Sequence, residues 1–261
     1  TESYAYDLFF QDDEKIVIAG AAADPSYQFS TLLMRLNADG SLDTSFDTDG
    51  FATPELSTAD DFAYAVAPLA DGRILIAGKA LNDQFMNAPV IARFNADGSL
   101  DTSFGTNGQT ALPVTQNDNT FSSIGLLPDG RIIASGHLDQ GLTTDGQFNF
   151  DVLLARFTVE GQLDNGFGTD GIVTAPVSAN YVEKALGQAI GADGNILVCG
   201  YTTQLDFSFD AILMEFDVDG ATVNGFGTNG ITVFDQAVQD VAYGIALQDD
   251  GKILITGTSG G

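Results

Sequence analysis

The stretch NADGSLDTSFGTNG, residues 95–108, decides the fold because it occurs four times in the chain. The other copies are NADGSLDTSFDTDG at 37–50, TVEGQLDNGFGTDG at 158–171 and DVDGATVNGFGTNG at 217–230. Five glycines that close an apolar run follow the same period, at spacings of 58, 58, 64 and 57 residues: Gly20, Gly78, Gly136, Gly200 and Gly257. A period near 58 residues predicts a repeat protein in which each copy is one supersecondary unit.

Each repeat contains four predicted strands. Strand A is Phe62–Leu69, an Asp-Gly turn follows it, and strand B is Arg73–Gly78. Strand C is Val90–Phe94, and strand D follows the repeated motif, as at Gly171–Pro176. Strands B and C carry apolar residues at both alternating sets of positions, so both of their faces are expected to be buried. Because such a sheet needs a like sheet on each side, the pattern favours an all-β propeller of four-stranded antiparallel blades over a β-helix or a β-sandwich.

We therefore expect a single five-bladed β-propeller domain over residues 1–261. Its repeats are predicted at about 4–60, 61–119, 120–180 and 181–239, followed by a half repeat at 240–261. Three interpretations of the half repeat stay open. It is part of a longer repeat protein, it is a two-stranded blade that closes a five-bladed ring, or it is an open half-blade that pairs with another chain to build a filament.

The combination DGRILIAG at 71–78 and ARFNADGSLDTSFGTNG at 92–108 resembles the delta-sixty repeat family of bacterial proteins. The domain of that family is a β-propeller of unknown function. The resemblance covers four repeats and half of a fifth, although Glu14 replaces the hairpin glycine of the first repeat and Val223 replaces the acidic residue of the fourth motif. It implies a secreted or cell-surface protein, that is, an extracellular localisation, and it carries over no catalytic residue.

The composition excludes several classes of partner and site. Asp and Glu total 36 against 9 Lys and Arg, a net charge of −27, so nucleic acid and anionic lipid would be repelled. No stretch approaches 18 consecutive apolar residues, which predicts no membrane insertion. Cys199 is the only cysteine and His137 the only histidine, which excludes an intramolecular disulfide and a His-pair zinc site. We predict no catalytic and no cofactor-binding residues, because acidic residues are too abundant for any chosen carboxylate pair to be informative.

The repeated motif contains a predicted ion pair. A bulged turn at 37–41 would place Arg35 opposite Asp43 across strands C and D. The pair recurs as Arg93 with Asp101 and Arg156 with Asp164, whereas the fourth copy has Glu215 opposite Val223. Joint loss of both partners favours a structural pair, and the phenylalanine that follows is expected to be a core residue. The alternative is a calcium site that uses Asp39, Asp43, Asp97 and Asp101, where oxygen-bearing side chains alternate.

Aromatic residues occupy the loop before strand C in four copies: Tyr27, Phe85, Phe148 and Phe207. Their alternation with further aromatics favours packing between blades. The alternative is a set of rim aromatics that stack on sugars or anchor a protein partner, and solvent exposure would distinguish the two.

Together these features predict a non-catalytic structural or binding module that assembles through its incomplete fifth blade into a homo-oligomer or filament. The partner is expected to be a protein or a carbohydrate. The alternative is a carbohydrate-active enzyme, or a calcium-dependent carbohydrate-binding propeller, that uses the acidic and aromatic loop residues.

Overall fold

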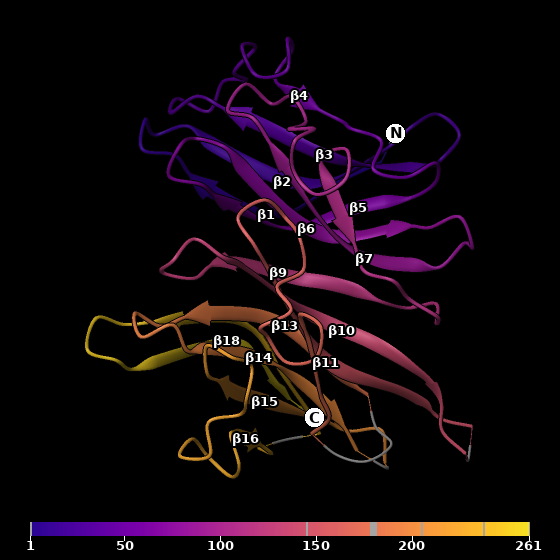
Figure 1. Cartoon of the computed structure of the whole chain (residues 1–261), viewed down its shortest axis with the longest axis vertical. Coiled ribbons are helices and arrows are strands. Elements are labelled where there is room, and N and C mark those ends of the chain that lie inside the picture. The colour runs from indigo at the N-terminus through magenta and orange to yellow at the C-terminus, as the bar shows by residue number, and fades with distance from the viewer. Residues whose placement is uncertain (1, 145, 178–181, 205, 237, 261) are drawn as a thin grey trace. The chain divides into compact units, whose positions relative to one another are not determined.

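The computed structural model describes residues 2–144, 146–177, 182–204, 206–236 and 238–260 (Figure 1). The first repeat forms β1 (Ser3–Phe10), β2 (Ile16–Ala23), β3 (Phe29–Leu36) and β4 (Phe51–Ala52). The second forms β5 (Asp61–Pro68), β6 (Ile74–Leu81), β7 (Asn87–Phe94) and β8 (Gln109–Ala111). The third forms β9 (Thr120–Leu126), β10 (Ile132–Leu142), β11 (Phe148–Phe157) and β12 (Ile172–Ala175). The fourth forms β13 (Glu183–Ile190), β14 (Ile196–Thr203), β15 (Phe209–Phe216) and β16 (Ile231–Phe234). Last come β17 (Gln239–Leu247) and β18 (Ile253–Gly260).

The all-β propeller prediction is confirmed, but the prediction of five blades is wrong. The described strands form four sheets, and in each of them strands A to D of one repeat lie in sequence order. Among the described residues β17 and β18, which correspond to strands A and B of a fifth repeat, form no separate sheet. They join the fourth sheet through a single parallel bridge between Phe209 and Gln239. We refer to the four sheets as blades 1 to 4 and to β17–β18 as the C-terminal hairpin.

The chain divides into two compact units. Unit 1 consists of Thr1–Ile124 and Glu160–Gln162, and unit 2 of Gly125–Val159 and Leu163–Gly261. In unit 1 the core lies between blades 1 and 2, where Leu33 and Phe46 pack with Ile76, Val90 and Phe94. In unit 2 strands from blades 3 and 4 form a second core, and the C-terminal hairpin packs on the other side of blade 4. Among the described residues, no helix has the length and apolar character to cross a membrane.

Glycines that set the repeat period lie at a β-bulge between strands A and B. In blades 1, 2 and 4 and in the C-terminal hairpin, strands A and B pair with the same irregularity, as where Ala63 lies opposite Gly78 and the next pair is Ala65 with Ala77. A Cβ on Gly78 would lie 1.9 Å from the carbonyl oxygen of Phe62. Only glycine fits so close an approach between two backbones, so this bulge fixes the residue type at that position of these repeats.

Candidate functional site: the open edge of the C-terminal hairpin

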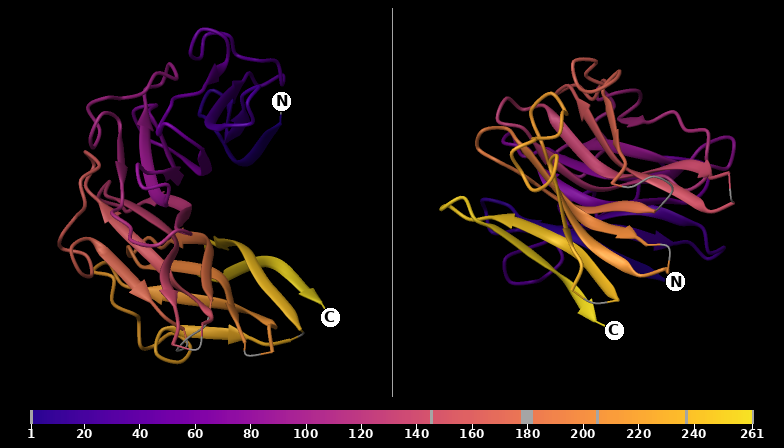
Figure 2. Two further views of the ribbon diagram at one scale, coloured as in Figure 1. Left: turned by 90° about the vertical axis from the view of Figure 1, so that its right-hand side faces the viewer. Right: turned by 90° about the horizontal axis from the view of Figure 1, so that it is seen from below.

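The C-terminal hairpin has the backbone register of strands A and B of a complete blade. Ala242 lies opposite Gly257, and the register then shifts so that Gly244 pairs with Thr256. In blade 2 the corresponding glycine of strand B also pairs, on its other side, with Val90 of strand C. β18 is the last strand of its sheet within the described residues, so the edge that strand C would occupy is open (Figure 2).

The exposure of β18 reflects the missing neighbours. Leu254 is 52% exposed, whereas Leu75 at the equivalent position in blade 2 is fully buried. Ile253 and Ile255 are half-buried, as are their counterparts in blade 1, whereas their counterparts in blades 2, 3 and 4 are buried. An open edge with apolar side chains on both faces is a template for pairing with another strand.

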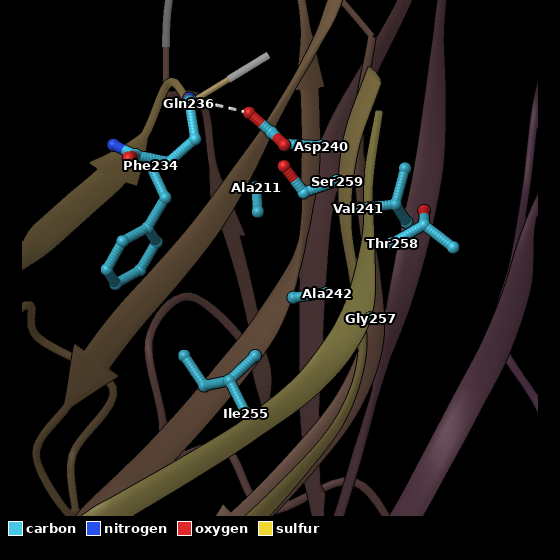
Figure 3. Close-up of a pocket in the computed structure, with 10 residues that line it drawn as sticks. All are labelled: Ala211, Phe234, Gln236, Asp240, Val241, Ala242, Ile255, Gly257, Thr258 and Ser259. Atoms are coloured by element: carbon cyan, nitrogen blue, oxygen red, sulfur yellow. Dashed lines mark hydrogen bonds between the residues drawn. The ribbon is translucent and has the colours of Figure 1, made fainter. Parts of the chain in front are cut away.

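A pocket of about 290 Å³ lies along this edge (Figure 3). The residues that line it come from blade 4 and the hairpin: Ala211, Phe234, Gln236, Asp240, Val241, Ala242, Ile255, Gly257, Thr258 and Ser259. The Phe234 ring and the Ile255 side chain form apolar walls. At the other end Asp240 lies opposite Ser259, and its Oδ2 accepts a hydrogen bond of 2.7 Å from the backbone N–H of Gln236. The pocket therefore has an apolar part and an acidic end.

The pseudo-symmetry of the chain shows which side chain the pocket lacks. Three of its residues correspond by register to residues of unit 1: Ala242 to Ala63, Ile255 to Ile76 and Ser259 to Ala80. In unit 1 those residues form one core with Val90, the fully buried strand C residue that pairs with Gly78. The described part of the fifth repeat has no strand C, so the pocket takes the place of a Val90-type side chain.

The acidic end of the pocket continues into blade 4. Burial raises the pKa of Asp210, and the nearby carboxylates of Asp235, Asp240 and Asp206 raise it further. The Gln204 side-chain amide opposes this shift by donating a 2.6 Å hydrogen bond to Asp210. Crowded carboxylates attract cations, so the electrostatics of this end favour a basic side chain in any group that approaches it.

The structure brings each Arg and Asp of the predicted pairs together and adds a third member. In blade 2, Asp101 Oδ2 lies 2.8 Å from Arg93 Nε and 3.2 Å from Arg73 Nη1. The same three positions are Lys15, Arg35 and Asp43 in blade 1 and Arg131, Arg156 and Asp164 in blade 3, with nitrogen–oxygen distances between 2.7 and 3.1 Å. The sequence analysis missed the basic residue that opens strand B. The signal was present, because this residue is Lys or Arg in every copy that has the pair.

Each arginine also contacts the repeated phenylalanine, and Arg35 and Arg156 are also hydrogen-bonded to the next blade of their own unit. The Arg93 guanidinium lies 4.6 Å from the centre of the Phe104 ring, a cation–π contact that recurs in blades 1 and 3. In unit 1, Arg35 Nη1 donates a 2.7 Å hydrogen bond to the carbonyl of Ala96 in the C–D turn of blade 2. The arginine thus connects successive blades as well as strands C and D.

Blade 4 is the exception. Glu215 stands at the position of the arginine and accepts a 2.9 Å hydrogen bond from Asn195, which replaces the basic residue of strand B. In the hairpin that basic residue returns as Lys252, which is paired with Asp250 and is 74% exposed on its side chain.

The aspartates considered for calcium have other partners. Asp39 Oδ1 accepts hydrogen bonds from the backbone N–H and hydroxyl of Ser41, and these lower its pKa. Asp97 has the same contacts with Ser99, and Asp43 and Asp101 belong to the clamps. In the part of the chain that the structure describes, no group of three or more His, Cys, Asp or Glu side chains is arranged so that it could hold a metal ion. Here the repeated aspartates serve turns and ion pairs.

The aromatic residues before strand C are exposed and do not pack between blades. Tyr27, Phe85 and Phe207 are 74%, 75% and 75% exposed, and Phe148 is 66% exposed. The first three share one turn position with a left-handed backbone, φ between 60° and 65°. In blade 3 that position is Gly146, and Phe148 lies two residues later at the start of β11. The four residues are therefore three equivalent turn aromatics and one strand residue.

Comparisons with known proteins agree with this architecture. Residues 11–46 and 69–104 match the family described as "Domain of unknown function (DUF5122) beta-propeller". The fold is a β-propeller. Comparison with curated protein sequences gave no match.

Among solved structures, a glucose dehydrogenase is similar over 98% of this chain and 78% of its own, with 13% identity and a TM-score of 0.54. A virginiamycin B lyase from Staphylococcus aureus is similar over 94% of this chain and 88% of its own, with 14% identity and a TM-score of 0.34. An exo-1,5-alpha-L-arabinanase from a bovine ruminal metagenomic library is similar over 96% and 76%, with 10% identity and a TM-score of 0.39. At such identities the likeness concerns the fold alone, so these enzymes assign no activity to this chain.

Proposed function

We propose that this chain is a non-catalytic structural and binding module, exposed on the outside of a bacterial cell, that docks a strand of a like repeat unit onto the open edge of β18. We also propose that the chain is a delta-sixty repeat protein and that the docked strand comes from a second copy of the chain. The observation that carries it is the pocket between blade 4 and the hairpin, which lies where a strand C side chain of a complete blade packs. Recognition would be β-augmentation, in which backbone hydrogen bonds give affinity and side-chain pockets give specificity.

The pattern of a suitable strand is provided by the chain itself. The strand C segments of blades 1, 2 and 3 place an apolar residue where it would enter the pocket and an arginine at the end of the strand. The exposed Lys252 occupies the position from which Lys15 and Arg73 reach the aspartate of the following C–D turn. A docked strand C and C–D turn would therefore bring an aspartate to Lys252 and complete the clamp.

The test is direct binding of a peptide with the sequence of residues 87–104, labelled with a fluorophore and followed by fluorescence anisotropy. We expect saturable binding by the whole chain. A second peptide carries Val90→Asp, which would place a carboxylate in an apolar and acidic pocket. Burial of a valine side chain contributes about 1.5–3 kcal/mol, so we expect the second peptide to bind at least about tenfold more weakly.

Matched protein variants place the same bulk on the two faces of β18. Ser259→Phe fills the pocket and should prevent peptide binding, whereas Thr256→Phe lies on the opposite face and should leave binding unchanged. Both positions are exposed, so neither change is expected to alter the melting temperature by more than a few degrees. Equal binding by both variants, or equal binding of both peptides, contradicts docking at this pocket.

Self-assembly is a separate measurement. Sedimentation velocity of the wild-type chain should show concentration-dependent dimers or larger species that Ser259→Phe reduces. A chain that stays monomeric yet binds the peptide would retain the strand-binding site and refute assembly with a second copy.

A further inference from the structure

Three aromatic residues adopt a backbone conformation that glycine adopts elsewhere in the same chain. The amide of Phe85 donates to the carbonyl of Asn82, and the amide of Asn82 donates to the carbonyl of Met86, which defines a tight hairpin turn between strands B and C. Tyr27 and Phe207 occupy the same position in turns with the same bonds. One further turn of this pattern has Glu14 at the same position, with φ of 65°, and eight have glycine: Gly40, Gly72, Gly98, Gly130, Gly146, Gly194, Gly220 and Gly251.

A bulky side chain in this conformation is an outlier that costs folding free energy. The cost is not offset by packing within the chain, because three quarters of each residue remains exposed. Blade 3 has Gly146 in the equivalent turn and keeps the same two hydrogen bonds, so the turn does not need the ring. The rings are best explained by contact with something outside the chain.

The surroundings of the rings indicate the chemistry of that ligand. The turns present hydroxyl, amide and carboxylate groups beside each ring, from Ser26, Gln84 and Asp206 among others. The face of an aromatic ring is electron-rich and attracts polarised C–H groups, which line the flat face of a sugar ring. The neighbouring oxygen atoms and amides can accept and donate hydrogen bonds to sugar hydroxyls.

The net charge of the chain and the isolation of each ring argue against the other classes of ligand that bind exposed aromatic residues. The net charge of −27 disfavours nucleic acid, anionic lipid and acidic polysaccharide. A protein interface would be centred on a contiguous apolar patch, whereas each ring here stands alone on a polar turn. Two such turns belong to successive blades of unit 1, which suits a ligand whose structure also repeats.

We propose that Tyr27, Phe85 and Phe207 form sugar-stacking sites on the turns between strands B and C, which bind a neutral polysaccharide. The proposal does not depend on strand docking at β18, because it rests on other residues at another edge of the blades. Several weak stacking contacts on one chain would act together on a polymer, so a polysaccharide should bind far more tightly than its monosaccharide.

The test is affinity electrophoresis of the wild-type chain through native gels that contain debranched arabinan, mixed-linkage β-glucan, xyloglucan or dextran. We expect retardation by at least one of these polymers. The triple variant Tyr27→Gly, Phe85→Gly and Phe207→Gly should lose the retardation, with a dissociation constant raised by at least about tenfold. Its melting temperature should rise, because glycine adopts the left-handed conformation without strain. A structural role for the rings would move the melting temperature in the opposite direction.

Tyr243→Ser is the matched control, since it removes an exposed aromatic ring from a strand of the hairpin. It should leave the retardation unchanged. Wild-type migration that none of the four polymers alters overturns the proposal. So does retardation that survives in the triple variant. A third outcome would also overturn the proposal. If the wild-type chain binds no polysaccharide but sediments with phosphatidylcholine vesicles, and the triple variant does not, the rings would be assigned to a membrane surface.

Discussion

Replacement of Asp101 by asparagine tests the three-residue clamp of blade 2. Asp101 is almost completely buried and accepts hydrogen bonds from Arg93, Arg73 and Ser103. Burial opposes ionisation of this carboxyl, but the hydrogen bonds from Ser103 and the two arginines prevail and lower its pKa from 3.8 to about 2. By proton linkage that shift corresponds to about 2 kcal/mol of folding free energy at neutral pH.

Asp101→Asn has a second cost, because it leaves the buried guanidinium of Arg93 beside a neutral group. Breaking a buried pair from one side costs about 3–5 kcal/mol in well-buried cases. We therefore expect the free energy of unfolding at pH 7 to fall by about 2–4 kcal/mol, which corresponds to roughly 4–15 °C in melting temperature.

The pH dependence separates the clamp from a general loss of packing. The folded-state pKa of Asp101 lies below its unfolded value, so its contribution is present above about pH 4 and is lost as the pH falls through about 2. Urea unfolding followed by circular dichroism at pH 7, 5 and 2.5 measures the difference between wild type and variant. The difference should be equal at pH 7 and 5 and smaller at pH 2.5.

A difference that is the same at all three pH values would refute the electrostatic argument, as would an unaffected variant at pH 7. Asp83→Asn serves as the control, because Asp83 is exposed on a turn. It should change the free energy of unfolding by no more than about 0.5 kcal/mol at any pH.

Three further predictions concern other elements. Val223→Asp should destabilise unit 2 by about 0.5–1 kcal/mol in thermal unfolding. Position 223 lies opposite Glu215 on the neighbouring strand, so the substitution would place two carboxylates of like charge face to face. Gly78→Ala should cost at least about 3 kcal/mol in urea unfolding, because its Cβ would overlap the carbonyl oxygen of Phe62. Cys199 should resist alkylation by iodoacetamide at pH 8 until the chain unfolds, since burial raises the pKa of its thiol to about 11.

Each of these has an internal reference. Restoring the full clamp with Val223→Asp, Glu215→Arg and Asn195→Arg should recover the stability that Val223→Asp alone removes. Gly260→Ala introduces the same methyl group where no atom lies within 4 Å, so it should be neutral. Rapid labelling of Cys199 in the folded chain, or a Gly78→Ala variant as stable as Gly260→Ala, would contradict the packing described for these positions.

The alignment of the repeats could be predicted from the sequence because it depends on local backbone and side-chain requirements that recur from repeat to repeat. Glycine is required where strand B passes the carbonyl of strand A, as at Gly78, and a repeated requirement leaves a period in the chain. The association of Arg93 with Asp101 could also be inferred, since the fourth copy changed both positions together. The basic residue Arg73 could have been found by the same comparison, because Asn195 replaces it in that copy.

Blade number and exposure could not be obtained in this way, because they depend on which elements surround a strand. The pattern of strands A and B in the fifth repeat equals that of a complete blade, yet the same pattern gives a buried Leu75 and an exposed Leu254. The rings of Tyr27 and Phe85 have the spacing of core residues, and only the turn geometry shows that they point to solvent.

The sequence alone determined the β-propeller architecture and the Arg–Asp pairs, because short-range backbone and cross-strand chemistry recurs in each copy. The tertiary structure decided that the described strands form four blades and that β17 and β18 join the fourth. It also decided where a pocket and exposed aromatic rings occur. These features depend on which elements surround a residue in three dimensions, and a residue pattern does not specify those elements.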